Sequence, residues 1–220
     1  MITSPLETRS AQPKIATETR VLLRGVSWNT YDQLTEERAG TIPRMTYDQG
    51  TLEFLTPGKL HESLAGLIDR MIFAYCQFAD IELLSAASTT FKRTDLTRGF
   101  EADRSYYFQN EHLIRAKDRI DLAIDPPPEL VIEVEITSSA IAKMDLFAAM
   151  GVQEVWRHDG SDLLIRRLVD GQYVDSEDSV CLPGISIPLI NRMLDRRGEF
   201  GENAFVREFH RQLESDSDPE

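Results

Sequence analysis

A short apolar run that carries two carboxylates constrains this chain more than any other part of its sequence. Residues 130–136 (LVIEVEI) follow three prolines and end at a Thr-Ser-Ser stretch. Their nearly continuous apolar character predicts a central, buried β-strand. Residues two apart on a strand point to the same face, so we expect Glu133 and Glu135 to lie side by side. Such a pair needs a partner that offsets its charge, and a metal ion is the usual partner.

Two further residues complete a set that suits phosphodiester hydrolysis. Asp103 leads a predicted strand over 101–108, and Lys143 lies on a predicted helix over 139–150 that ends at Gly151. Magnesium prefers hard oxygen ligands and keeps several waters, so two or three carboxylates suffice to hold it. The ion polarises a phosphate and acidifies a bound water, and a lysine orients that water. Acids at this spacing on an edge strand are often merely solvated, and the pattern alone leaves that alternative open.

Length, composition and charge narrow the class of protein. The chain has 220 residues, of which 41% are hydrophobic and 28% charged, as expected for one globular domain. Its net charge of −13 excludes a basic surface over the whole chain but allows a local basic groove. Cys76 and Cys181 lie far apart, which argues against a zinc site or a disulfide framework. Without a membrane-spanning run or a signal pattern, we expect a cytoplasmic protein with no membrane partner.

The rest of the chain predicts one α/β domain with polar ends. We expect a flexible tail over 1–20, a single domain over 21–200 and an acidic disordered tail over 213–220. The other expected elements are a short helix capped by Ser27, a hairpin over 45–55, a long amphipathic helix over 60–78, strands over 81–84, 89–92, 153–158, 163–168 and 172–174, and a last helix that begins between 183 and 194. The segments 92–98 and 115–119 are basic loops, which either grip phosphates or are simply solvated.

Several blocks occur in the order that is typical of one protein family. The blocks are 99–103 (GFEAD), 105–107 (SYY), 125–139 (DPPPELVIEVEITSS) and 151–157 (GVQEVWR). Together with the hairpin and the His61-Glu62 pair, they resemble the Uma-two family, bacterial restriction-endonuclease-like proteins of the PD-(D/E)XK superfamily. The resemblance spans residues 25 to 190. It implies a restriction-endonuclease-like mixed β-sheet flanked by helices, with an added N-terminal hairpin and C-terminal strands, and Mg²⁺-dependent cleavage of DNA.

The same resemblance assigns roles to individual residues. Asp103 corresponds to the first motif acid and Glu133 to the acid of the (D/E)-x-K motif, and both are implied metal ligands. Position 135 holds glutamate where the superfamily most often has lysine, so either Lys143 supplies the cation from the following helix or the site is degenerate. Ala102 replaces the proline of the first motif. The expected catalytic set is therefore Asp103, Glu133, Glu135 and Lys143, with the three carboxylates holding Mg²⁺ or Mn²⁺.

Four other residues near these blocks allow more than one interpretation. Glu62, and with it His61, is a possible accessory to the metal site, but we favour a charged pair at a helix start for Glu62 and a cap or surface position for His61. Asp121 lies closer in sequence to the strand acids than Asp103 does, and it is the alternative first acid. We favour Asp103 because its flanking residues match the family better. Glu53, in the hairpin, is expected to be exposed and has no assigned role.

Two classes of function follow. The first is a Mg²⁺-dependent DNA endonuclease, which we expect to act as a homodimer or other homo-oligomer because cutting both strands takes two sites. The second is a catalytically inactive protein with a nuclease fold that binds nucleic acid or protein, as Glu135 and the net charge of −13 favour. A metal-dependent hydrolase of a small substrate is a weaker third hypothesis.

Overall fold

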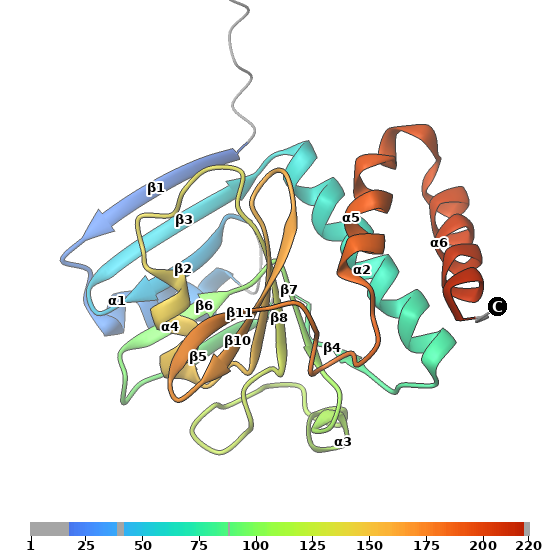
Figure 1. The fold of residues 1–220 in the computed structure, drawn as a ribbon. Helices are drawn as coiled ribbons and strands as arrows, with labels where there is room; N and C mark the ends of the chain where they lie inside the picture. Colours follow the sequence, from blue (N-terminus) through green and yellow to red (C-terminus); the bar gives the residue numbers. More distant parts are fainter. Residues whose placement is uncertain (1–17, 39–41, 88, 218–220) are drawn as a thin grey trace, which may run out of the picture.

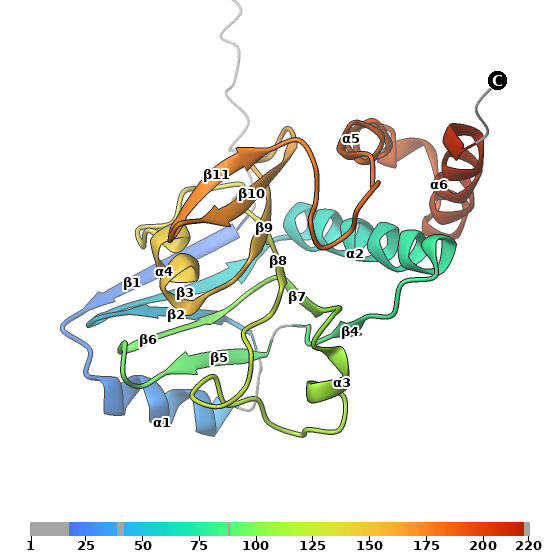
Figure 2. The ribbon, with the colours of Figure 1, turned by 60° about the horizontal axis from the view of Figure 1, so that its bottom comes forward.

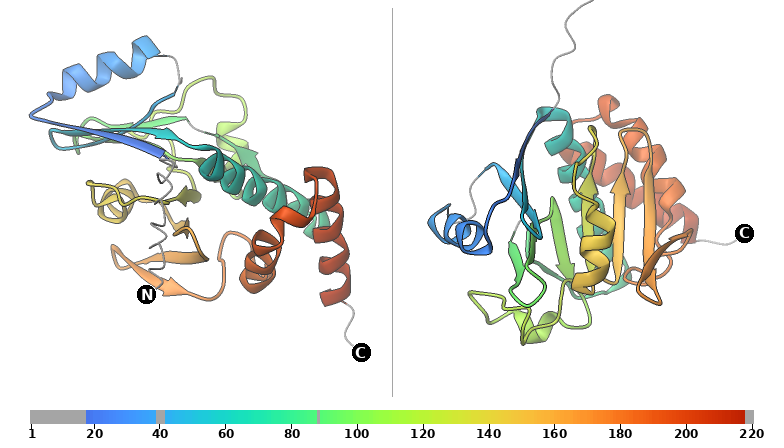
Figure 3. Two further views of the ribbon diagram at one scale, coloured as in Figure 1. Left: turned by 90° about the horizontal axis from the view of Figure 1, so that it is seen from above. Right: turned by 90° about the vertical axis from the view of Figure 1, so that its left-hand side faces the viewer.

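Two β-sheets and six α-helices make up the described part of the chain (Figure 1). The structure is a computed structural model, and it describes residues 18–38, 42–87 and 89–217. Helix α1 (Trp28–Arg38) and the helix pair α5 (Ile187–Asp195) and α6 (Glu202–Ser217) lie at opposite ends of the molecule (Figures 2 and 3). The two sheets lie between these ends, and the chain passes from one to the other several times.

The first sheet is antiparallel throughout. Its strands are β1 (Glu18–Arg24), β2 (Arg44–Asp48), β3 (Thr51–Pro57), β5 (Thr90–Arg93) and β6 (Arg98–Glu101). They lie in the order β1-β3-β2-β6-β5. The predicted hairpin is confirmed, and its turn at Gln49 and Gly50 has positive φ angles of 45° and 97°. The predicted cap is also confirmed, because the Thr30 backbone N–H donates to Ser27 Oγ at the start of α1.

The second sheet is mixed, as predicted. Its strands are β4 (Leu84–Ser85), β7 (Arg104–Tyr107), β8 (Leu130–Val134), β9 (Glu154–His158), β10 (Leu163–Val169) and β11 (Gln172–Ser176). They lie in the order β11-β10-β9-β8-β7-β4, and β8 pairs with β9 in parallel. All five residues of β8 are buried, which confirms the central strand predicted from its apolar run.

Helices α2 (Lys59–Ala79), α4 (Lys143–Met150) and α5 contact strands of the second sheet, and α6 extends the fold beyond the predicted domain boundary at residue 200. The remaining ones are α3 (Glu111–Ile114) and the short 3-10 helix η1 (Arg197–Glu199). Helix α2 packs on β8, and α5 and α6 pack on α2 (Figure 2). No helix in the described ranges is long and apolar enough to cross a bilayer.

Both predicted tail boundaries need correction. Strand β1 begins at Glu18, inside the expected N-terminal tail, and residues 1–17 lie outside the described part of the chain. Helix α6 continues to Ser217, so most of the expected acidic tail over 213–220 is helical. Its apolar residues at positions 205, 209 and 213 recur at helical spacing and are buried in the core around α2, which holds the helix in place.

Four elements also have boundaries that differ from the predictions. The strand predicted over 101–108 is two strands, β6 and β7, in different sheets. Strand β8 ends at Val134 rather than at 136, and the strand predicted over 81–84 is reduced to the two residues of β4. Helix α4 begins at Lys143 rather than at 139, and in the segment before it the Ser139 and Ala140 backbone N–H groups donate to the carboxylates of Glu135 and Glu53.

Candidate active site

Asp103 lies where the chain crosses from the first sheet to the second. Strand β6 ends two residues before it, and β7 begins immediately after it. Because β6 pairs with β2 and β7 pairs with β8, this crossing brings Arg44 of β2 and Val134 of β8 to the Asp103 side chain. The topology therefore encloses Asp103, which is 1% exposed.

Three donors bind the Asp103 carboxylate. Oδ1 accepts hydrogen bonds from Arg44 Nη1 at 2.6 Å and from His61 Nε2 at 2.8 Å, and Oδ2 accepts one from the Val134 backbone N–H at 2.7 Å. Burial alone would raise the pKa of Asp103. The hydrogen bond from His61 and the charge of Arg44 outweigh burial and lower this pKa to about 2, so Asp103 is a carboxylate at neutral pH.

His61 joins Asp103 to the first strand of the chain. Its Nδ1 donates to Glu18 Oε2 at 2.8 Å, and its Nε2 faces Asp103. A ring that donates from both nitrogens carries a positive charge. Burial would lower the pKa of His61, but the two carboxylates outweigh it and raise this pKa. The accessory residue considered in the sequence thus holds the candidate catalytic acid in place.

Glu133 and Lys143 form the second half of the site. Lys143 Nζ donates to Glu133 Oε2 at 2.5 Å, and both side chains are buried. Burial raises the pKa of Glu133, and the neighbouring Asp103 adds to this, while Lys143 offsets part of it. Burial would lower the pKa of Lys143, but Glu133 and Asp103 outweigh it and raise this pKa. The structure therefore brings together Asp103, Glu133 and Lys143, which the sequence placed on three separate elements.

Residues 28–189 match the Uma2 family, whose description is "Putative restriction endonuclease". The chain belongs to this family. A crystal structure of a putative nuclease belonging to DUF820 from Anabaena variabilis has a similar fold, with a TM-score of 0.53 and 16% sequence identity. The similarity covers 77% of this chain and 99% of that one. A comparison with curated proteins found no match.

In this Uma2 protein, Glu135 lies beyond the end of β8 and has its own partners. Its Oε1 accepts from the Ser139 backbone N–H at 2.8 Å, and its Oε2 accepts from Arg157 Nε at 2.7 Å. Burial would raise the pKa of Glu135, but these two donors outweigh it and lower this pKa. Within the described ranges, no group of three or more His, Cys, Asp or Glu side chains is arranged to hold a metal ion. Glu135 is thus not gathered with Asp103 and Glu133 into such a group.

The loop between β8 and α4 is fastened to the first sheet by two buried acids. Glu18 accepts a hydrogen bond from the Thr137 backbone N–H at 2.8 Å. Glu53 accepts from Ser139 Oγ and from the Ala140 backbone N–H, both at 2.9 Å. Arg20 lies between the two acids and pairs with each of them.

The expected exposure of Glu53 is therefore wrong, because its side chain is 2% exposed. Nothing in its local sequence marks it, since its partners come from a distant loop and from β1. Arg44, Glu18 and Arg20 were missed for the same reason. They reach the site only through the pairing of β1 with β3 and of β2 with β6.

The other two candidate acids lie at the margin of the site or outside it. Glu62, in the first turn of α2, accepts a hydrogen bond from Arg44 Nη2 at 2.8 Å, and its side chain is 39% exposed. Asp121 is exposed and accepts from the Ala123 backbone N–H in its own loop. Of the two alternative first acids, the structure places Asp103 beside Glu133.

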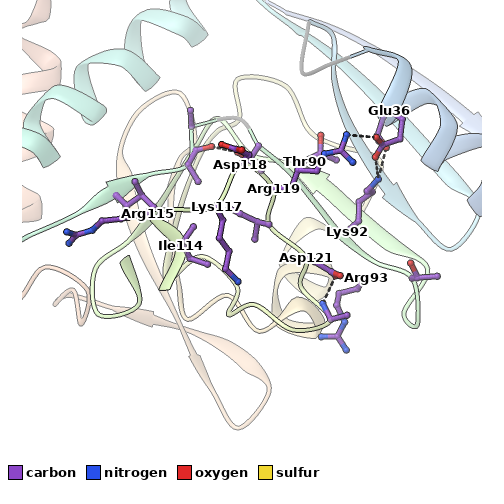
Figure 4. Close-up of a pocket in the computed structure, with 18 of the residues that line it drawn as sticks. Glu36, Thr90, Lys92, Arg93, Ile114, Arg115, Lys117, Asp118, Arg119 and Asp121 are labelled. Atoms are coloured by element: carbon purple, nitrogen blue, oxygen red, sulfur yellow. Dashed lines mark hydrogen bonds and ion pairs between the residues drawn. The ribbon is translucent and has the colours of Figure 1, made fainter. Parts of the chain in front are cut away.

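The two basic loops line one groove of about 1320 Å³, which holds neither Asp103 nor Glu133 (Figure 4). Its charged residues are Lys92, Arg93, Arg115, Lys117 and Arg119 with Glu36, Asp95, Asp118 and Asp121. The basic side chains form ion pairs with nearby acids, as Lys92 and Arg119 do with Glu36. Because these charges nearly cancel, the groove resembles a solvated surface more than a phosphate-binding site.

Proposed function

We propose that this Uma2 family member is a Mg²⁺-dependent endonuclease that hydrolyses phosphodiester bonds of DNA. The family and the structural neighbour support a nuclease. The observation that carries the proposal further is the buried pair of acids, Asp103 and Glu133, each of which is bound by a cationic side chain. Two adjacent buried carboxylates with opposing cations are suited to bind a divalent metal and an anionic substrate together.

The donor set fits magnesium or manganese. Asp103 and Glu133 supply carboxylate oxygens, which are hard ligands, and Mg²⁺ keeps several waters, so two carboxylates suffice. When bound, the ion would polarise an oxygen of the substrate phosphate and lower the pKa of a water molecule. Glu135 would join as a third oxygen donor after releasing Arg157, which now occupies its Oε2.

The acids around Lys143 determine its charge, and its charge determines its proposed role. Its raised pKa keeps the ammonium protonated at neutral pH, so it serves as a hydrogen-bond donor and a fixed positive charge rather than as a base. Held against Glu133, it can orient the attacking water and stabilise the negative charge that develops on the phosphate.

The experiment that tests this proposal is cleavage of supercoiled plasmid DNA in Mg²⁺ and in EDTA. We expect Glu133→Gln to lower the rate at least about a hundredfold, because it removes a carboxylate ligand from a site where charge stabilisation dominates. Asp121→Asn is the matched control, since it removes an acid outside the site, and we expect it to cleave like the wild type. Circular dichroism melting would verify that both variants fold. Full activity of Glu133→Gln would refute the assignment.

One observation favours the alternative of an inactive, DNA- or protein-binding member. Both oxygens of Asp103 already accept hydrogen bonds from protein donors, and Lys143 already neutralises Glu133. A calorimetric titration without Mg²⁺ or Mn²⁺ binding at millimolar concentration would support this second function over the first.

A further inference from the structure

Three cationic side chains surround the acids of the candidate site, and they differ in what lies on their outer side. His61 is enclosed between Glu18 and Asp103, and Lys143 is buried against Glu133. Arg44, in contrast, has one partner inside the site and another that faces the solvent. Among these three cations, Arg44 is therefore the one whose outer carboxylate partner, Glu62, an incoming anion can displace.

The two arms of the Arg44 guanidinium bind two different carboxylates. Nη1 donates to Asp103 Oδ1 at 2.6 Å, and Nη2 donates to Glu62 Oε1 at 2.8 Å. The inner carboxylate is 1% exposed and the outer one 39%. The planar guanidinium thus marks the border between the buried acids and the solvent.

Glu62 is held loosely compared with the other acids around the site. In the described part of the chain, the carboxylate of Glu62 makes no side-chain hydrogen bond besides the one from Arg44. Glu18 and Glu53, by comparison, each accept hydrogen bonds from two donors of the loop after β8. A half-exposed carboxylate with one ionic partner is exchanged for another anion at little cost.

We propose that Arg44 binds a phosphate of the DNA backbone beside the bond that is cleaved, and that Glu62 occupies the position of this phosphate in the free protein. The inference rests on the proposed nuclease function. Arginine suits the exchange because its rigid fork of N–H donors matches the oxygens of a phosphate as well as those of a carboxylate. The local charge is conserved, because one anion replaces another while Nη1 stays on Asp103.

This arrangement makes the two partners of one ion pair act in opposite directions. Arg44 supports substrate binding, whereas Glu62 competes with the substrate for the same guanidinium. A purely structural ion pair, or a Glu62 that holds the metal, would instead make both substitutions harmful. The sign of the Glu62 effect therefore decides between these interpretations.

The test measures the affinity of a fluorescent DNA duplex by anisotropy in Ca²⁺ and its cleavage in Mg²⁺. Arg44→Met removes a charge-assisted donor to a neighbouring phosphate, so we expect it to weaken duplex binding about ten- to a hundredfold and to lower cleavage at subsaturating DNA by the same factor. Arg44→Lys keeps the charge without the fork, and we expect an intermediate loss. Glu62→Gln should tighten duplex binding about two- to fivefold, the effect of releasing one partly exposed ion pair.

The matched control is Glu202→Gln. Glu202 pairs with Arg70 at 2.7 Å on the exposed faces of α6 and α2, so its substitution removes the same charge far from the site. We expect its duplex affinity to equal that of the wild type. Weaker binding by Glu62→Gln, or a gain no larger than that of Glu202→Gln, would overturn the inference. Thermal melting of each variant separates these effects from misfolding. Because Glu62 is partly exposed, we expect Glu62→Gln to fold, so its binding measurement tests the inference even if Arg44→Met unfolds.

If the wild-type protein neither binds nor cuts DNA, the proposed function is refuted. The binding of an anion by Arg44 can then be tested separately. Inorganic phosphate would then be titrated while the Arg44 Nε–Hε resonance is followed by NMR. A shift that saturates at lower phosphate concentration in Glu62→Gln supports the inference. An unmoved Arg44 resonance in both proteins contradicts it.

Discussion

At the scale of single residues, Lys143 is the part of the site whose function depends most on its surroundings. Its ammonium is buried, yet Glu133 and Asp103 together keep it charged. The Lys143–Glu133 pair therefore contributes both to the proposed chemistry and to the stability of the loop and helix that follow β8. These two contributions can be measured separately.

We expect Lys143→Met to lower DNA cleavage about a hundredfold or more, because it removes the fixed charge beside the phosphate. The same change leaves Glu133 buried without its partner and should cost about 3 kcal/mol of unfolding free energy in urea titrations. Adding Glu133→Gln should recover most of this stability, because a neutral side chain replaces the unpaired charge, without restoring cleavage. Cleavage at the wild-type rate by Lys143→Met would contradict the assigned role.

The sequence predicted Asp103, Glu133 and Lys143 because each lies in a recognisable local block. It did not predict Arg44, Glu18 or Glu53, which are charged residues within strands whose neighbours in sequence say nothing of their partners. Their positions depend on the register of β1, β2 and β3, and register is set by contacts distant in sequence.

At the scale of elements, β1 and the loop after β8 hold each other through Glu18. This acid accepts hydrogen bonds from the Thr137 backbone N–H and hydroxyl and faces His61 on its other side. Burial would raise the pKa of Glu18, but the donors on Thr137 and His61 outweigh it and lower this pKa below its ordinary value of 4.5. Its stabilising effect is thus fully present above pH 4.5 and is lost as the pH falls through the folded-state pKa.

We expect Glu18→Gln to lower the free energy of unfolding by about 1–3 kcal/mol at neutral pH, because several donors lose a charged acceptor. The difference from the wild type should shrink as the pH falls below 4.5, since the wild-type carboxyl is then protonated as well. Urea denaturation followed by tryptophan fluorescence over this pH range measures both quantities. A difference that stays constant or grows on acidification would show that Glu18 does not act as a carboxylate.

Elements with a strong local pattern were predicted well, and those shaped by distant contacts were not. The hairpin of β2 and β3, helix α2 and the strands β8 to β11 carry clear periodicity. Helix α4 starts four residues later than expected, and the segment before it is held by Glu53 and Glu135, which accept from the Ala140 and Ser139 backbone N–H groups. The strand expected over 101–108 divides at Asp103 because the chain changes sheets there.

At the scale of the whole molecule, the net charge of the chain is strongly negative, whereas one groove on its surface is nearly neutral. The chain has a net charge of −13, and the groove lined by the two basic loops is nearly neutral. The charges of that groove thus do not favour DNA, and we propose that substrate binding depends on the metal, Arg44 and Lys143 at the junction of the two sheets. The expected homo-oligomer, which would supply two such sites for duplex cleavage, stays a prediction.

We propose above that Asp103 and Glu133 hold a divalent metal at the junction of the two sheets. A crystal soaked in Mn²⁺ and measured at the manganese absorption edge tests it most directly. We predict an anomalous peak within coordination distance of both carboxylates, with Lys143 beside it, and no such peak at Asp121. A fully soaked crystal that shows no peak between Asp103 and Glu133, or shows its peak at Asp121, would rule out this metal site.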